Sequence, residues 1–186
     1  MKIRACAALF VLVAPGYASA QSLSGFRVEA HTGVDRVETD VDDTGVLYGI
    51  GLGYDFAIGS STFAGVEVNL DGTNAGRCES GRIIAGDLLC SESAQDISVL
   101  ARLGTRVSDR GKIYAALGYS SFQVDVDYTA GGVTRSSDQT LEGIRAAVGY
   151  QHNLSERFYL KGEYRYTGYG SGERRHQGVV GFGISF

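Results

Sequence analysis

Hydrophobic residues along most of this chain recur at every second position, in stretches of roughly ten residues. Successive side chains of a β-strand point to opposite faces, so this period predicts strands with one apolar face and one small or charged face. For example, Ile50 and Leu52 alternate with Gly49 and Gly51. Eight such stretches occur, at 26–34, 48–56, 64–70, 97–106, 113–126, 144–150, 158–166 and 178–186. The pattern predicts an all-β chain.

The composition of the second face indicates which side of the sheet contacts lipid. A soluble eight-stranded barrel would bury its apolar face, whereas a membrane barrel turns that face to lipid. Here the second face carries glycine, serine, alanine and ions, which are too small and too polar for an apolar core. Tyrosine and phenylalanine also gather near the strand ends, as membrane-interface girdles require. We therefore predict an eight-stranded antiparallel up-and-down transmembrane β-barrel.

The N-terminal segment is predicted to be removed before the barrel forms. Lys2 and Arg4 precede an apolar stretch at 5–14, and Ala18-Ser19-Ala20 follows as a cleavage site, which is the layout of a secretory signal peptide. The expected domains are a signal peptide at 1–20 and a barrel at 21–186. Losing the two basic residues lowers the net charge from −4 to −6, which disfavours nucleic acid as a partner. The mean hydropathy of −0.04 and the absence of a long apolar run after residue 20 exclude a conventional helical membrane protein.

The links between the predicted strands alternate in length. Short turns are expected at 57–61, 108–111 and 153–157, and long loops at 35–45, 71–95, 127–138 and 168–174. This is the layout of short periplasmic turns and longer extracellular loops. In the fifth stretch Phe122 and Val124 lie on the opposite parity from Ile113, which predicts either a β-bulge near Ser120-Ser121 or a strand that rises beyond the bilayer.

Two segments carry a family resemblance. Residues 178–186, with apolar side chains at alternate positions and a terminal Phe186, resemble the terminal signature by which bacterial outer-membrane barrels are recognised by their assembly machinery. Residues 149–166 resemble the penultimate hairpin of the opacity-protein/OmpA-like family of small outer-membrane β-barrels. The resemblance implies a monomer in the bacterial cell outer membrane, with Phe182, Ile184 and Phe186 as the assembly signal. It also implies outer-membrane lipids, lipopolysaccharide and the barrel assembly machinery as partners.

The inward face is predicted to hold a network of charged side chains. An eight-stranded barrel is just wide enough for its own side chains to fill it, and charges away from water must be paired. We therefore expect salt bridges that plug the lumen. A narrow cation-lined porin that prefers anions is the alternative. The candidates are six cations and four anions, Arg27, Glu29, Asp55, Glu67, Arg102, Arg106, Arg145, Lys161, Glu163 and Arg165.

Two cysteines remain in the predicted mature chain, Cys78 and Cys90, within the longest loop. An even pair in an oxidising compartment predicts a disulfide, and neither cysteine has the partners of a metal site. The segment 35–43 holds five acids and one base, which suggests either a solvated acidic loop or a weak divalent-cation site. We expect no metal and no cofactor.

The predicted function is a structural or surface-interaction role carried by the extracellular loops, and a lipid A-modifying enzyme is a weaker alternative. Such an enzyme needs a nucleophile beside a base. None of the three histidines, His31, His152 and His176, has a serine two positions away, so the chain is not expected to be an enzyme.

Overall fold

The computed structural model describes residues 23–38, 43–73, 77–80, 88–130, 133–170 and 172–186. The predicted signal peptide at 1–20 lies outside these residues, as does most of the predicted acidic loop after Glu38. The strands are β1 (Gly25–Glu38), β2 (Asp43–Ala57), β3 (Thr62–Thr73), β4 (Arg77–Ser80), β5 (Leu88–Arg106), β6 (Gly111–Ala130), β7 (Val133–Asn153), β8 (Phe158–Tyr169) and β9 (Arg174–Ser185). No helix within these residues is long and apolar enough to cross a membrane.

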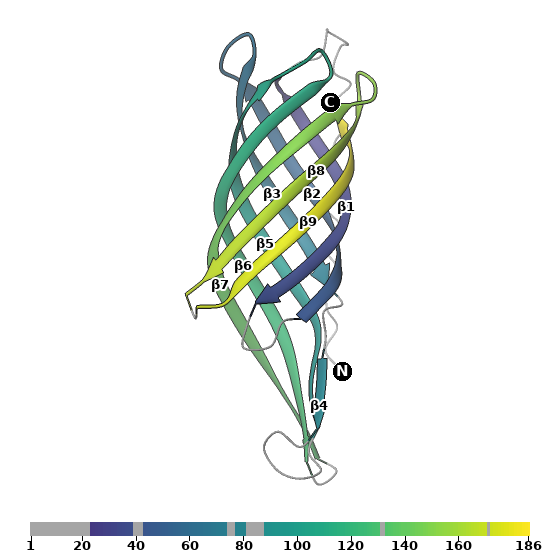
Figure 1. The fold of residues 1–186 in the computed structure, drawn as a ribbon, viewed down its shortest axis with the longest axis vertical. Coiled ribbons are helices and arrows are strands. Elements are labelled where there is room, and N and C mark those ends of the chain that lie inside the picture. Colours follow the sequence, from purple (N-terminus) through teal and green to yellow (C-terminus); the bar gives the residue numbers. More distant parts are fainter. Residues whose placement is uncertain (1–22, 39–42, 74–76, 81–87, 131–132, 171) are drawn as a thin grey trace, which may run out of the picture.

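Eight of these strands close into an antiparallel barrel (Figure 1). The order around the sheet is β3-β2-β1-β9-β8-β7-β6-β5, and pairing of β3 with β5 joins its two edges. The first and last strands are neighbours, with Ala30 opposite Phe182. The predicted eight-stranded up-and-down barrel is confirmed. β4 is an additional short strand that pairs with the outer part of β5.

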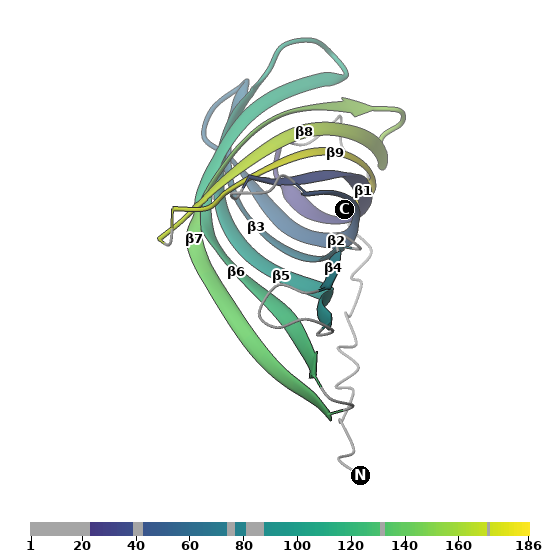
Figure 2. The ribbon, with the colours of Figure 1, turned by 60° about the horizontal axis from the view of Figure 1, so that its bottom comes forward.

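The two ends of the barrel differ. At one end, here called the turn end, short turns join β2 to β3, β5 to β6 and β7 to β8. In each turn one amide donates to the carbonyl four residues on, as Ile58 does to Thr62 at 2.9 Å and Leu154 does to Phe158 at 2.8 Å. At the other end, the extension end, β5, β6 and β7 continue far beyond the barrel (Figures 1 and 2).

The strands run further than their apolar faces indicated. β6 and β7 have 20 and 21 residues and remain paired from Gly111 opposite His152 to Ala130 opposite Val133. A membrane strand needs only about 9–11 residues. Much of the predicted loops at 71–95 and 127–138 is therefore strand, because backbone pairing continues in water where an apolar face is no longer required.

The predicted bulge near Ser120-Ser121 is wrong. The register of β6 with β7 is continuous there, and the shift in the sheet lies instead in β5 between Glu92 and Ala94. Ser120 and Phe122 are both buried inside the barrel, so the parity of β6 does not change. The other explanation, a strand that rises beyond the bilayer, agrees with the length of β6.

The assignment of the two faces is confirmed. Ile50 and Val99 are 53% and 54% exposed on the outside of the barrel, whereas Arg102 is only 2% exposed inside it. At the turn end the outer face carries ring contacts such as Tyr54 with Phe56, at 4.7 Å between centroids, and Phe158 with Phe182, at 5.7 Å. These rings match the girdle that a membrane interface favours.

The inside is not as small and polar as its glycines suggested. At the turn end, Leu23, Phe63 and Tyr114 pack together, and at the extension end Phe122 packs against Tyr169. These side chains occupy inward positions between outward residues, which is the parity that the strand pattern itself defines. Apolar groups thus lie in the lumen near both ends of the barrel.

Cys78 and Cys90 are opposed in the register of β4 and β5. Directly opposed residues of antiparallel strands have Cα atoms about 4.5–5.5 Å apart, within the range that a disulfide bridges. The side chains of both cysteines lie outside the described part of the structure, so the disulfide stays a prediction.

We predict that protein isolated from the cell envelope carries this disulfide. A thiol-alkylating reagent under denaturing, non-reducing conditions should label neither Cys78 nor Cys90, and both should react after reduction, as peptide mass spectrometry would show. Labelling of both cysteines without reductant would contradict the bridge.

Candidate functional site

Charged side chains fill the inside of the barrel. Nine of the ten residues predicted to face the lumen are buried, and the tenth, Arg106, is half-buried at the turn end of β5. The structure adds further charged groups beside them. We call the whole set the lumen network: Arg27, Glu29, His31, Asp35, Asp55, Glu67, Asp71, Asp96, Arg102, Lys112, Arg145, Lys161, Glu163, Arg165 and Arg175.

Two arginines and two carboxylates alternate near the turn end. The Arg27 guanidinium lies 3.1 Å from Asp55 through Nε and donates to Glu67 Oε2 at 3.1 Å through Nη2. Arg102 donates to the same Glu67 oxygen at 3.1 Å and lies 3.6 Å from Asp55. Arg102 also covers the Tyr114 ring, at 3.9 Å from its centroid. Each charge in this group therefore faces two of opposite sign.

The middle of the lumen is organised around Lys161. Its Nζ lies 2.5 Å from Glu29 Oε1 and 3.6 Å from both Glu67 and Glu163. Arg165 then connects Glu163 to Asp71, because it donates to Glu163 Oε1 at 2.5 Å and to Asp71 Oδ2 at 2.9 Å. The ion pairs are thus continuous from one level of the barrel to the next.

His31 lies between two carboxylates in this middle level. Its Nε2 is 2.5 Å from Asp71 Oδ1, and its Nδ1 is 3.2 Å from Glu29 Oε1. Ionised carboxylates only accept hydrogen bonds, so both contacts together require an imidazole that is protonated on both nitrogens. His31 then acts as one more cation of the lumen network.

Asp35, Asp96, Arg145 and Arg175 close the network toward the extension end. Arg175 binds Asp35 with two nitrogens, at 2.8 and 2.5 Å, and donates to Asp96 at 2.5 Å with the third. Arg145 pairs with the same Asp96 oxygen. It also donates to Thr167 at 2.8 Å. Both guanidiniums therefore have fork-like hydrogen bonds that fix their orientation.

Several members of the lumen network were not among the sequence candidates. Asp71, Asp96 and Arg175 lie just beyond the apolar stretches, at positions where the same inward parity continues. Lys112 and the two tyrosines Tyr114 and Tyr159 lie within or beside the stretches, also at inward positions. Continuing the alternation past the last apolar residue would have identified all of them.

These additions change the charge balance of the lumen. The sequence candidates were six cations and four anions, which would favour anions in a pore. Apart from His31, the buried network contains seven arginines and lysines and seven carboxylates. With His31 protonated the buried set holds eight cations against seven anions, so the predicted excess of two cations falls to one, because Asp35, Asp71 and Asp96 were assigned to loops or left out. Asp35 in particular pairs with Arg175 in the lumen and is not part of a solvated acidic loop.

Glycines let partners on two strands meet across a third. Tyr114 on β6 and Glu163 on β8 both pair in register with Gly149 of β7, and the Tyr114 hydroxyl donates to Glu163 at 2.5 Å across it. A Cβ atom at Gly149 would overlap the Tyr114 ring. The same arrangement recurs where Tyr159 donates to Glu29 at 3.1 Å across Gly183. These two sites tie three strands together through side chains.

The other two histidines lie outside the network. His152 is near the turn end, where its Nδ1 is 3.2 Å from the Tyr150 hydroxyl. His176 faces outward toward the extension end, with Nδ1 2.6 Å from the Tyr164 hydroxyl and Nε2 3.7 Å from Glu38. Within the described residues, no group of three or more histidine, cysteine or acidic side chains is placed to hold a metal ion.

Comparisons with known proteins agree with the fold. A family model described as an outer membrane protein β-barrel domain matches residues 5–186. Among solved structures, Ail of Yersinia pestis aligns over 87% of this chain and 99% of its own, with 19% identity and a TM-score of 0.63. Neisserial surface protein A aligns over 88% and 98%, with 18% identity and a TM-score of 0.63. OprG of Pseudomonas aeruginosa aligns over 90% and 99%, with 11% identity and a TM-score of 0.51. A search of curated proteins finds no match.

Replacing Glu67 with glutamine should destabilise the barrel strongly. The amide keeps the shape but removes the charge that faces Arg27, Arg102 and Lys161, and uncompensated buried charges cost about 3–5 kcal/mol. Urea unfolding of the reconstituted protein, followed by circular dichroism because the chain has no tryptophan, measures this loss. Glu156→Gln in an exposed turn is the control and should change the free energy of unfolding by less than about 0.5 kcal/mol. Equal stability of the two variants would show that the ion pairs contribute little.

A side chain at Gly149 should break the cross-strand contact behind it. Gly149→Val forces Tyr114 away from Glu163, and overpacking of this kind costs about 1–3 kcal/mol. Gly178→Val is the matched control, because Gly178 is an exposed strand glycine with open space where its Cβ would be. The same unfolding assay should show a loss for Gly149→Val alone, and an equal loss for both would point to backbone effects instead.

Proposed function

Because this chain belongs to the outer membrane protein β-barrel domain family, we propose that it is a closed, non-enzymatic barrel of the bacterial outer membrane whose extracellular strands form an interaction surface. In such barrels the short turns face the periplasm and the long connections face the outside. The turn end is then periplasmic and the extension end extracellular. Processing after Ala20 and a monomeric state are parts of the same proposal.

The proposal that the lumen is plugged rests on the burial of the lumen network. Arg145 and Arg165 are 0% exposed, although an aqueous channel would wet the charged side chains that line it. Their neighbours are carboxylates at hydrogen-bonding distance, such as Asp71 2.9 Å from Arg165. These guanidinium groups therefore contact carboxylates and not solvent.

The charge balance supports a plug over an anion-preferring pore. A selective channel uses rings of one charge sign. The buried set instead alternates cations and anions at each level, and its arginines and lysines equal its carboxylates in number. Nearly all of the charge in the lumen is therefore cancelled within the network, with an excess of one cation where His31 is protonated.

The extensions of β5, β6 and β7 support the surface role. With β4, these strands continue past the barrel at the extracellular end (Figure 2). A continuous strand ladder holds this part of the chain more firmly than a coil would, and presentation of binding residues on such projections is common in rigid scaffolds.

The positions of the histidines support a non-enzymatic role. His31 contacts two carboxylates inside the barrel, and His152 and His176 contact tyrosine hydroxyls. A lipid A-modifying hydrolase would instead place a base beside a serine or threonine nucleophile.

The proposal also includes contacts made during and after assembly. The outward side chains of Phe182 and Phe186, each 48% exposed, together with Ile184, are proposed to be read by the barrel assembly machinery. Lipopolysaccharide is the proposed lipid partner around the extracellular rim, where Arg36 and Arg174 lie exposed on neighbouring strands.

Single-channel recording tests the plugged lumen. The wild-type protein in a planar bilayer should show no steady open events, because its lumen is filled by paired side chains. A slower gel migration after boiling would verify that the same preparation is folded. Steady unitary currents that are lost in Arg102→Glu or Arg106→Glu would instead establish the narrow porin.

A further inference from the structure

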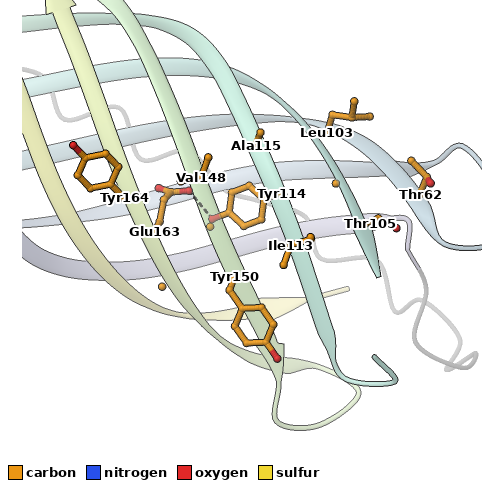
Figure 3. Close-up of a pocket in the computed structure, with 13 residues that line it drawn as sticks. Thr62, Leu103, Thr105, Ile113, Tyr114, Ala115, Val148, Tyr150, Glu163 and Tyr164 are labelled. Atoms are coloured by element: carbon orange, nitrogen blue, oxygen red, sulfur yellow. Dashed lines mark hydrogen bonds between the residues drawn. The ribbon is translucent and has the colours of Figure 1, made fainter. Parts of the chain in front are cut away.

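A groove runs along the outer wall of the barrel near the turn end, with a volume of about 800 Å³ (Figure 3). It crosses β5 to β8 and reaches Thr62 at the start of β3. Two outward rows of paired residues form it: Leu103, Ala115, Val148 and Tyr164 in one, and Thr105, Ile113, Tyr150 and Gly162 in the other.

The groove exists because small residues lie between large ones. Ala115 and Gly162 are low points of the wall, and a Cβ atom at Gly162 would meet nothing within 4 Å. Val148 and Tyr164 rise beside them, at 56% and 48% exposure. Tyr150 borders the same groove on the side toward the turns (Figure 3).

The environment of this wall is hydrocarbon, since the outward face of the barrel contacts lipid. A groove in such a wall is filled by acyl chains, whose methylene groups match its apolar lining. The polarity also changes along the groove: Thr62 and Thr105 lie at the end nearest the turns, and Leu103 and Val148 lie further in. This gradient is that of a membrane lipid whose headgroup is at the periplasmic surface.

The two turns next to the groove, β5–β6 and β7–β8, carry charged side chains of both signs. The turn from β5 to β6 contains Asp109 and Arg110, and the turn from β7 to β8 contains Glu156 and Arg157. All four side chains are exposed. The third short turn, at 58–61, leads into Thr62 at the edge of the groove and contains no charged residue.

We propose that this groove binds one glycerophospholipid of the periplasmic leaflet, with an acyl chain along Ala115 and Gly162 and its phosphate beside Arg110 and Arg157. The acidic neighbours Asp109 and Glu156 favour a zwitterionic headgroup, because they can contact an ammonium group while the arginines contact the phosphate. Phosphatidylethanolamine has this chemistry. The inference rests on the membrane position of the barrel and is independent of whether the lumen conducts.

Native mass spectrometry of the full processed protein, extracted from outer membranes in a mild detergent, tests this site. The wild type should retain one phosphatidylethanolamine molecule. Gly162→Leu fills the groove and should lower the retained fraction by about tenfold, the effect of losing contact with roughly two methylene groups. Gly178→Leu is the matched control: Gly178 is also an outward glycine with open space, lies on β9 outside the groove, and should retain the lipid as the wild type does.

The headgroup is tested separately with added lipids. Arg110→Gln combined with Arg157→Gln should weaken binding of phosphatidylethanolamine and leave binding of diacylglycerol, which has no phosphate, unchanged. Arg36→Gln combined with Arg174→Gln, at the opposite end, is the control because it removes the same two charges. Equal retention by Gly162→Leu and Gly178→Leu, no retained phospholipid in the wild type, or recovery of lipopolysaccharide in place of phospholipid would overturn the proposal. A conducting lumen would not affect it, so its failure and that of the plugged barrel are distinguishable.

Discussion

The constraint on which this structure depends is that hydrocarbon offers no hydrogen-bond partner to a peptide group. Every backbone amide and carbonyl in the membrane must therefore be paired within the sheet, and the sheet must close, as β3 does on β5. Closure then assigns the two faces. Side chains on the outside meet lipid and are apolar, so the charged side chains of the same strands can only point into the lumen. The buried network is a consequence of this exclusion, and its members must satisfy one another.

Pairing inside a narrow barrel requires room for long side chains to cross. In several strands that room comes from inward glycines. Gly53 of β2 lies against the Arg27 guanidinium, and Gly149 and Gly183 let tyrosines of one strand reach glutamates two strands away. Arginines also connect charges along the barrel axis, as Arg165 does between Glu163 and Asp71. The glycine content of the inward face is thus explained by the size of its neighbours. It does not indicate an empty lumen.

The alternation of residues predicted the strand faces, the closure and most of the buried charges, because a period of two is a direct property of extended backbone. It did not predict where the strands end. Asp71 was assigned to a loop and Asp96 was left out, since the apolar face stops at Leu70 and starts at Ile97, yet the backbone pairing continues through both. The pattern reports the thickness of the hydrocarbon, and the strand ladder is longer than that. For Phe122 the pattern left two explanations, a bulge or a strand that rises beyond the bilayer, and the buried Phe122 side chain on the long strand β6 agrees with the second. Partners such as Asp35 and Arg175, which are 140 residues apart in sequence, depend on the closure register and could not be paired from the pattern.

At the groove, a buried hydrogen bond on the inward face of the barrel supports the residues of the outward face. Its two outward rows enclose one inward row, in which Tyr114 bonds Glu163 behind Gly149. That buried hydrogen bond joins β6 to β8 through side chains, in addition to the backbone ladders on either side of β7. A wall held in this way is preorganised, which lowers the ordering cost of binding the proposed lipid. The side chains that fill the lumen are therefore also what give the lipid-facing surface a fixed shape.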